Sequence, residues 1–65
     1  MLNRDNVRKL MRAKGITAVQ LASKVGVSPS MMSYILSGLR DPSLQTLIRM
    51  ADELECATID ELILR

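Results

Sequence analysis

One stretch constrains the fold of this chain more than any other: TAVQLASKVGVSPSMMSYILSG, residues 17–38. Gly26 lies in its middle, where a helix can end at positive φ, a conformation that glycine adopts at little steric cost. Ser28 and Pro29 follow as an N-cap and a first helical residue, where the missing N–H of proline is not needed. The stretch therefore predicts two short helices joined by a tight glycine turn.

Apolar residues three and four positions apart indicate helices along the whole chain. The expected helices are residues 3–14, 18–25, 29–37, 42–54 and a short one through residue 64. Their start signals are Asn3, Thr17, Ser28, Asp41 before Pro42, and Thr58. The edge predicted to be buried on the fourth helix is Leu44, Leu47, Ile48, Ala51 and Leu54. We expect one all-α domain over residues 1–65, a compact bundle of five short helices.

Composition excludes several classes of protein. The chain has 65 residues, no histidine and one cysteine, so it cannot form an internal disulfide or a histidine–cysteine metal site. It also lacks a glycine-rich phosphate loop and a nucleophile–base pair for catalysis. No apolar run is long enough for a signal peptide or a membrane span. We expect a cytoplasmic protein that is not an enzyme and holds no metal, cofactor or small-molecule ligand.

Charge is divided unevenly along the chain. Residues 1–40 hold seven basic residues and one acidic residue, a net charge of +6. Residues 41–65 hold two basic and six acidic residues, a net charge of −4. A small protein with a basic end and an acidic end orients in the field of a polyanion such as nucleic acid. The alternative is that both sets of charges simply solvate helix surfaces.

The helix expected over residues 29–37 has an uncharged outer stripe opposite its apolar edge. The stripe, at spacing i, i+3, i+4 and i+7, is Ser30, Ser33, Tyr34 and Ser37. Small hydroxyl side chains let a helix approach the DNA major groove and bond to base edges, and Met31 on the flank can contact a thymine methyl group. Arginine, asparagine and glutamine are absent from this helix, so DNA affinity is expected to come mainly from phosphates. The alternative is that this stripe is the solvated side of a surface helix.

A family resemblance covers nearly the whole chain. Residues 15–38, the run GLRDPSLQTLIRMADEL after them and the closing TIDEL resemble the phage-repressor and Cro type of helix-turn-helix domain, the lambda-repressor-like family. The resemblance includes Gly15, the LASKVGVSPS junction and the DPSLQTL segment. It implies a sequence-specific DNA-binding transcriptional regulator, a repressor, that inserts its third helix into the major groove of double-stranded DNA as a homodimer.

The resemblance also implies roles for individual residues. The base-facing positions are Pro29, Ser30, Met31, Ser33 and Tyr34. The phosphate contacts are Thr17 and Ala18 through their backbone amides, Lys24, Ser37, Leu39 through its amide, and Arg40. At the carboxyl end the chain carries more apolar residues than one helix face can bury, which suggests a homodimer interface or, alternatively, completion of a small core. These residues are Ile59, Leu62, Ile63 and Leu64.

The chain departs from the family pattern at several positions. Ala18 stands where members usually have a glutamine that bonds a phosphate. Met11 and Leu36 stand where phage members often pair an arginine with a glutamate, and we expect these two side chains to touch, since an apolar pair can replace a buried ion pair without loss of stability. Ala18 and the uncharged third helix favour an alternative, a protein-interaction or antitoxin-like module of the same fold with weak or no specific DNA binding. The net charge of +6 argues against it.

Overall fold

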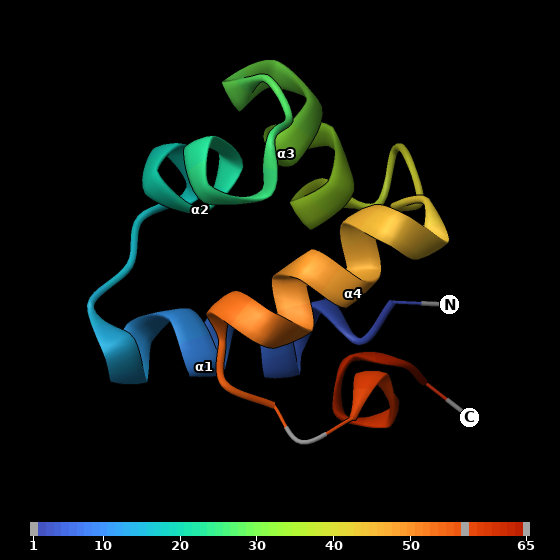
Figure 1. The fold of residues 1–65 in the computed structure, drawn as a ribbon. Helices are drawn as coiled ribbons and strands as arrows, with labels where there is room; N and C mark the ends of the chain where they lie inside the picture. The colour runs from blue at the N-terminus through green and yellow to red at the C-terminus, as the bar shows by residue number, and fades with distance from the viewer. Residues whose placement is uncertain (1, 57, 65) are drawn as a thin grey trace.

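The computed structural model describes residues 2–56 and 58–64, and the described chain is all-helical apart from one isolated bridge (Figure 1). Its elements are α1 (Arg4–Lys14), α2 (Ala18–Val25), α3 (Pro29–Ser37), α4 (Leu44–Glu53) and a 3-10 helix, η1 (Ile59–Leu62). The predicted all-α class is confirmed. The expected five helices are four α-helices and one 3-10 turn.

The two helices predicted within residues 17–38 begin and end at the expected residues. The Thr17 side chain accepts a hydrogen bond from the Gln20 amide at 3.2 Å, and the Gln20 side chain accepts one from the Thr17 amide at 2.9 Å. The Ser28 hydroxyl oxygen accepts from the Met31 amide at 3.0 Å, and Gly26 has a φ of 79°. These contacts are local, so the sequence alone sufficed to predict them.

One predicted helix start and one predicted capping bond are wrong. α4 begins at Leu44, because the Ser43 hydroxyl caps it by accepting from the Thr46 amide at 3.1 Å, whereas Asp41 and Pro42 precede the helix. Thr58 makes no side-chain capping bond, and the segment after it is a single 3-10 turn. This turn is short because residues 62 and 63 bond to the other end of the chain: the Asn3 amide donates to the Leu62 carbonyl at 2.7 Å, and Ile63 forms an antiparallel bridge with Leu2.

All four α-helices and η1 supply side chains to one core, and η1 packs against α1 and α4 (Figure 1). Its largest fully buried side chains are Val7, Leu21, Val25, Met32, Ile35, Met50, Leu54 and Leu62. The buried edge of α4 differs from the prediction: Met50 is fully buried, while Leu44 and Ile48 are 65% and 52% exposed. The inner stripe is Leu47, Met50, Ala51 and Leu54, which has helical spacing and turns residues 44 and 48 outward. Met11 and Leu36 both belong to the core, and their direct contact stays a prediction.

Arginines from the flanking helices cover the carboxyl ends of α2 and α3. Arg49 of α4 donates to the carbonyl oxygen of Val25, the last residue of α2, at 3.4 Å. Arg8 of α1 donates to the carbonyl oxygen of Leu36, near the end of α3, at 2.8 Å. Cations are favourable at helix carboxyl ends, where unpaired carbonyl groups concentrate negative charge. The two central helices are thereby tied to the rest of the chain by polar contacts as well as by the core.

Candidate nucleic-acid interface

α3 buries one side and exposes the other, as its sequence predicts. Met32 and Ile35 are 0% and 2% exposed, whereas the exposed side carries Pro29, Ser30, Ser33, Tyr34 and Ser37. Met31 is half-buried on the flank. Four of the five positions assigned to bases are therefore exposed and the fifth is accessible at the edge. Their contact with bases stays a prediction.

The hydroxyl groups of this helix are not equally available. The Ser28 oxygen is committed to the helix cap, and the Ser37 hydroxyl donates to the Tyr34 carbonyl at 3.1 Å. Within the described part of the chain, the hydroxyls of Ser30, Ser33 and Tyr34 have no hydrogen-bond partner. A hydroxyl both donates and accepts, so these groups can bond to several base edges and discriminate among them only modestly.

The amino end of α2 offers two unpaired backbone amides. Ala18 and Val19 occupy the first two helical positions, whose N–H groups have no intrahelical acceptor. The Thr17 amide is not available as predicted, because it already donates to the Gln20 side chain. Two parallel N–H groups at the positive end of a helix dipole suit a phosphate oxygen. Val19 was missed by the sequence analysis, although its position directly after Ala18 in a capped helix was the signal.

The turn after α3 differs from the prediction in its donors. The amides of Leu39 and Arg40 both donate to the Tyr34 carbonyl oxygen, at 3.0 and 3.2 Å. Gly38 permits this closure with a φ of 89°. The Leu39 amide is therefore occupied inside the protein, and the Ser37 hydroxyl, which bonds to the same carbonyl, cannot donate to a phosphate in this rotamer. The Arg40 side chain is exposed and remains the predicted phosphate contact at this end.

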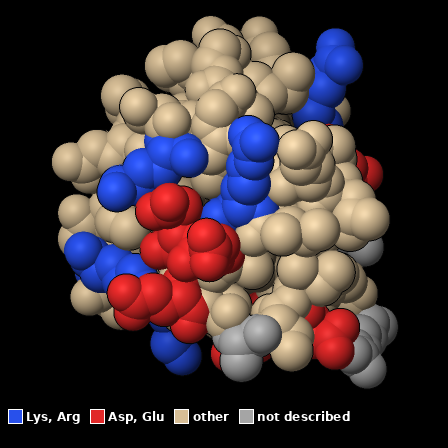
Figure 2. All heavy atoms as spheres, viewed as in Figure 1, with Lys and Arg blue, Asp and Glu red and all other residues tan. Residues whose placement is uncertain are grey.

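Acidic and basic residues do not lie at separate ends of the folded molecule. On the face that carries α4, acidic and basic side chains lie side by side, and several basic side chains also lie above the main group of acidic ones (Figure 2). Lys24 lies 3.7 Å from Glu53, and Lys14 pairs with Glu55 at 2.6 Å. The hydrogen bond and charge of Lys14 lower the pKa of Glu55. The Lys24–Glu53 pair arises because α4 packs against α2. The acidic half of the sequence thus partly neutralises the basic half, and Lys24 is less available for its predicted phosphate contact.

Two further arginines, for which the sequence predicted no role, belong to this region. Arg8 reaches the Leu36 carbonyl, and the Arg4 guanidinium lies against Gly38, where an added Cβ atom would be only 2.9 Å from its Cζ atom. They lie 28 and 34 positions before these partners, so no local sequence signal brings them together. Their spacing of four residues, which places them on the same side of α1, was the only available clue.

The apolar residues of the carboxyl end are only partly available to a partner. Leu62 is 0% exposed and completes the core, so its assignment to a dimer interface is wrong. Ile59 and Ile63 are half-buried, and Leu64 is 49% exposed. The exposed side chains of Leu44 and Ile48 on α4 extend the apolar surface. Ile48 and Ile59 line one shallow groove together.

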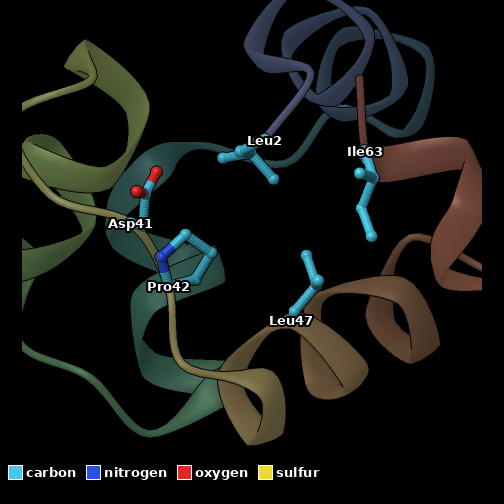
Figure 3. Close-up of a pocket in the computed structure, with 5 residues that line it drawn as sticks. All are labelled: Leu2, Asp41, Pro42, Leu47 and Ile63. Carbon is cyan, nitrogen blue, oxygen red and sulfur yellow. The ribbon is translucent and has the colours of Figure 1, made fainter. Parts of the chain in front are cut away.

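The hollow drawn in Figure 3 is smaller than a common small-molecule pocket. A hollow of about 200 Å³ lies between Leu2, Pro42, Leu47 and Ile63, with Asp41 at its edge (Figure 3). Small-molecule pockets commonly measure about 300–1,000 Å³ and place several polar groups around the ligand. Among residues 2–56 and 58–64, no group of three or more histidine, cysteine or acidic side chains is placed to hold a metal ion. In the same residues no helix has the length and apolar character needed to cross a membrane.

A comparison with known protein families identifies the family of this chain. The helix-turn-helix family HTH_3, of the Cro and lambda-repressor type, matches residues 7–62. The chain belongs to this family of DNA-binding, typically non-enzymatic domains. The match extends from the middle of α1 to the end of η1, which agrees with the predicted resemblance. Searches among curated proteins and among solved structures gave no match.

Proposed function

We propose that this protein is a sequence-specific transcriptional regulator that acts in the cytoplasm as a repressor, with α3 in the major groove of its operator. The observation that carries the proposal is the exposed, uncharged side of α3, which lies between two groups suited to phosphates. These groups are the amides of Ala18 and Val19 at the start of α2, and the Arg40 side chain after α3. A bound regulator of this kind represses by occupying DNA that the transcription machinery needs.

The relative weight of base and phosphate contacts predicts how strongly binding depends on DNA sequence and on salt. Three hydroxyls on α3 discriminate weakly among bases, so sequence preference depends also on contacts with thymine methyl groups and on DNA deformability. Phosphate contacts supply most of the affinity and make it fall as salt rises. We therefore expect modest discrimination between operator and random DNA, with strong salt dependence for both.

We further propose that the protein binds as a homodimer, with one copy on each of two half-sites about 34 Å apart. The dimer interface includes Ile59, Ile63 and Leu64, together with Leu44 and Ile48 of α4. Exposed apolar side chains grouped on one face commonly mark a protein interface. Replacement of Leu44 and Ile48 by glutamine is expected to shift the sedimentation coefficient to that of a monomer, whereas Val19→Gln, at an exposed apolar residue outside this interface, leaves it unchanged.

A fluorescence-anisotropy titration with a random duplex at two salt concentrations tests DNA binding. We expect micromolar or tighter binding at low salt and a clear loss at the higher concentration. The absence of salt-sensitive binding at micromolar protein would refute the proposed function. Selection from a random duplex pool then identifies the operator, and sedimentation of the selected complex gives its stoichiometry.

A second candidate function is a protein-interaction or antitoxin-like module of the same fold. Ala18 lacks the side-chain phosphate contact usual in the family, and Leu44 and Ile48 offer an apolar surface to another protein. Failure of the DNA titration, combined with a monomeric state that persists at high concentration, would favour this candidate.

A further inference from the structure

Two arginines of α1 lie at the carboxyl end of α3, and the function proposed above does not use them. The Arg8 Nη2 atom donates to the Leu36 carbonyl oxygen at 2.8 Å. The Arg4 guanidinium lies against Gly38, with its Cζ, Nη1 and Nη2 atoms 2.9–3.2 Å from the position that a Cβ atom would occupy. Both guanidinium groups are therefore held beside the turn of residues 38–40.

This end of α3 needs added positive charge if it is to face a phosphate. A helix carboxyl end carries roughly half a negative elementary charge, which repels anions. The backbone donors of the turn are already bonded to the Tyr34 carbonyl oxygen. Arg40 is the only cation that the turn itself supplies. The guanidinium groups from α1 reverse the sign of the local field without any change in α3.

We infer that Arg4 and Arg8 form a binding site for a phosphate of the DNA backbone at the carboxyl end of α3, an inference that rests on the proposed DNA binding. A guanidinium has five N–H donors, and the Leu36 carbonyl accepts from only one Nη atom of Arg8. That bond fixes the group in place, and the remaining donors can bond phosphate oxygens in a paired geometry. The two arginines thus replace the Leu39 amide and the Ser37 hydroxyl as the partners of this phosphate.

Charge-removing variants of α1 test the site. Arg4→Gln and Arg8→Gln each remove one cation from it, and Lys9→Gln removes one cation from an exposed position of the same helix as the control. Affinity for one fluorescein-labelled random duplex is measured by anisotropy between about 50 and 200 mM salt. Loss of one phosphate contact lowers the slope of log affinity against log salt by about 0.9. Over this range, the factor by which affinity falls should therefore be about 3.5 times smaller for each arginine variant than for the unchanged protein. The Lys9 variant should show the same slope as the unchanged protein.

The slope separates phosphate binding from a purely structural role. Partial unfolding of a variant lowers its affinity by a similar factor at every salt concentration and leaves the slope in place, and melting curves in the same buffers measure that factor. Arg8→Lys keeps the charge and should keep most of the slope, which provides a second readout if Arg8→Gln does not fold. Equal slopes for the arginine variants and the Lys9 variant would overturn the inference while leaving DNA binding intact. Absence of salt-sensitive binding by the unchanged protein would overturn both.

Discussion

Substitution of Gly38 by alanine should destabilise the fold in two separable ways. Gly38 has a φ of 89°, and a non-glycine residue in the left-handed region costs about 1–2 kcal/mol. A Cβ atom there would also displace the Arg4 guanidinium, and loss of a cation from a helix carboxyl end costs about 0.3–1 kcal/mol. Alanine also lowers the conformational entropy of the unfolded chain relative to glycine, which stabilises the fold by about 0.5 kcal/mol. The expected net loss is about 0.8–2.5 kcal/mol.

Gly15 provides the matched control for the backbone cost. It also ends a helix, with a φ of 67°, but a Cβ atom added there meets nothing within 4 Å. Gly15→Ala should therefore cost only about 1 kcal/mol. Arg4→Ala combined with Gly38→Ala completes a double-mutant cycle in which the φ of residue 38 is the same in both backgrounds. In the Arg4→Ala background, the cost of Gly38→Ala should fall by about 0.3–1 kcal/mol.

Urea and thermal unfolding followed by circular dichroism at 222 nm suit this chain, because it has no tryptophan. For a domain of this size, about 1 kcal/mol corresponds to a shift of about 4–8 °C in Tm, so the coupling is measurable. A coupling energy of zero between the Arg4 and Gly38 substitutions would refute the contact and the reasoning built on it. The contact would also be refuted if Gly15→Ala and Gly38→Ala lowered the free energy of unfolding equally, both with Arg4 present and in the Arg4→Ala background.

Three further predictions concern single side chains. Ser28→Ala should lower the free energy of unfolding by about 1 kcal/mol, measured in urea, because α3 loses its cap. Ser30→Ala, on the exposed side of α3, should change it by no more than about 0.5 kcal/mol. Similar costs for the two variants would contradict the cap assignment. Lys14→Met should raise the pKa of Glu55 in an NMR titration, because the hydrogen bond and charge of Lys14 hold that pKa low. The pair stabilises the fold above the unfolded pKa of Glu55, and this contribution is lost as pH falls through the lowered pKa. An unchanged pKa of Glu55 in the variant would disprove the pairing in solution. Burial and the nearby acid raise the pKa of the Cys56 thiol, so iodoacetamide should alkylate it more slowly at pH 8 than a cysteine in an unfolded peptide, and urea should remove the difference; equal rates without urea would count against burial.

Local signals predicted the central part of the fold, because its determinants lie within a few residues of one another. The Thr17–Gln20 box, the Gly26 turn and the Ser28 cap each involve neighbours in sequence. The start of α4 was mispredicted since two possible starts, Asp41 with Pro42 and the adjacent serine, stand side by side and propensity does not choose between them. The outward rotation of Leu44 follows from how α4 packs against other helices, which a single-helix pattern does not specify.

The candidate site was predictable in outline, and its errors have two causes. The exposed side of α3 follows from its own periodicity. The availability of each donor, by contrast, depends on competing acceptors: the Tyr34 carbonyl takes the Leu39 amide, and the Gln20 side chain takes the Thr17 amide. Arg8 reaches α3 only because α1 packs nearby, a contact between residues 28 positions apart. The two competing acceptors lie within a few residues of their donors, whereas the Arg8 contact is long-range and leaves no trace in local spacing.

The bridge between Leu2 and Ile63 makes the chain almost a closed ring. Both ends of the chain lie across the molecule from α3, beyond α4 (Figure 1). A fluorophore or affinity handle attached near the carboxyl end therefore starts from the side away from the exposed face of α3. The same closure makes the chain suitable for circular permutation: a short linker between residues 2 and 63, with new ends opened in residues 39–43, would leave every helix whole.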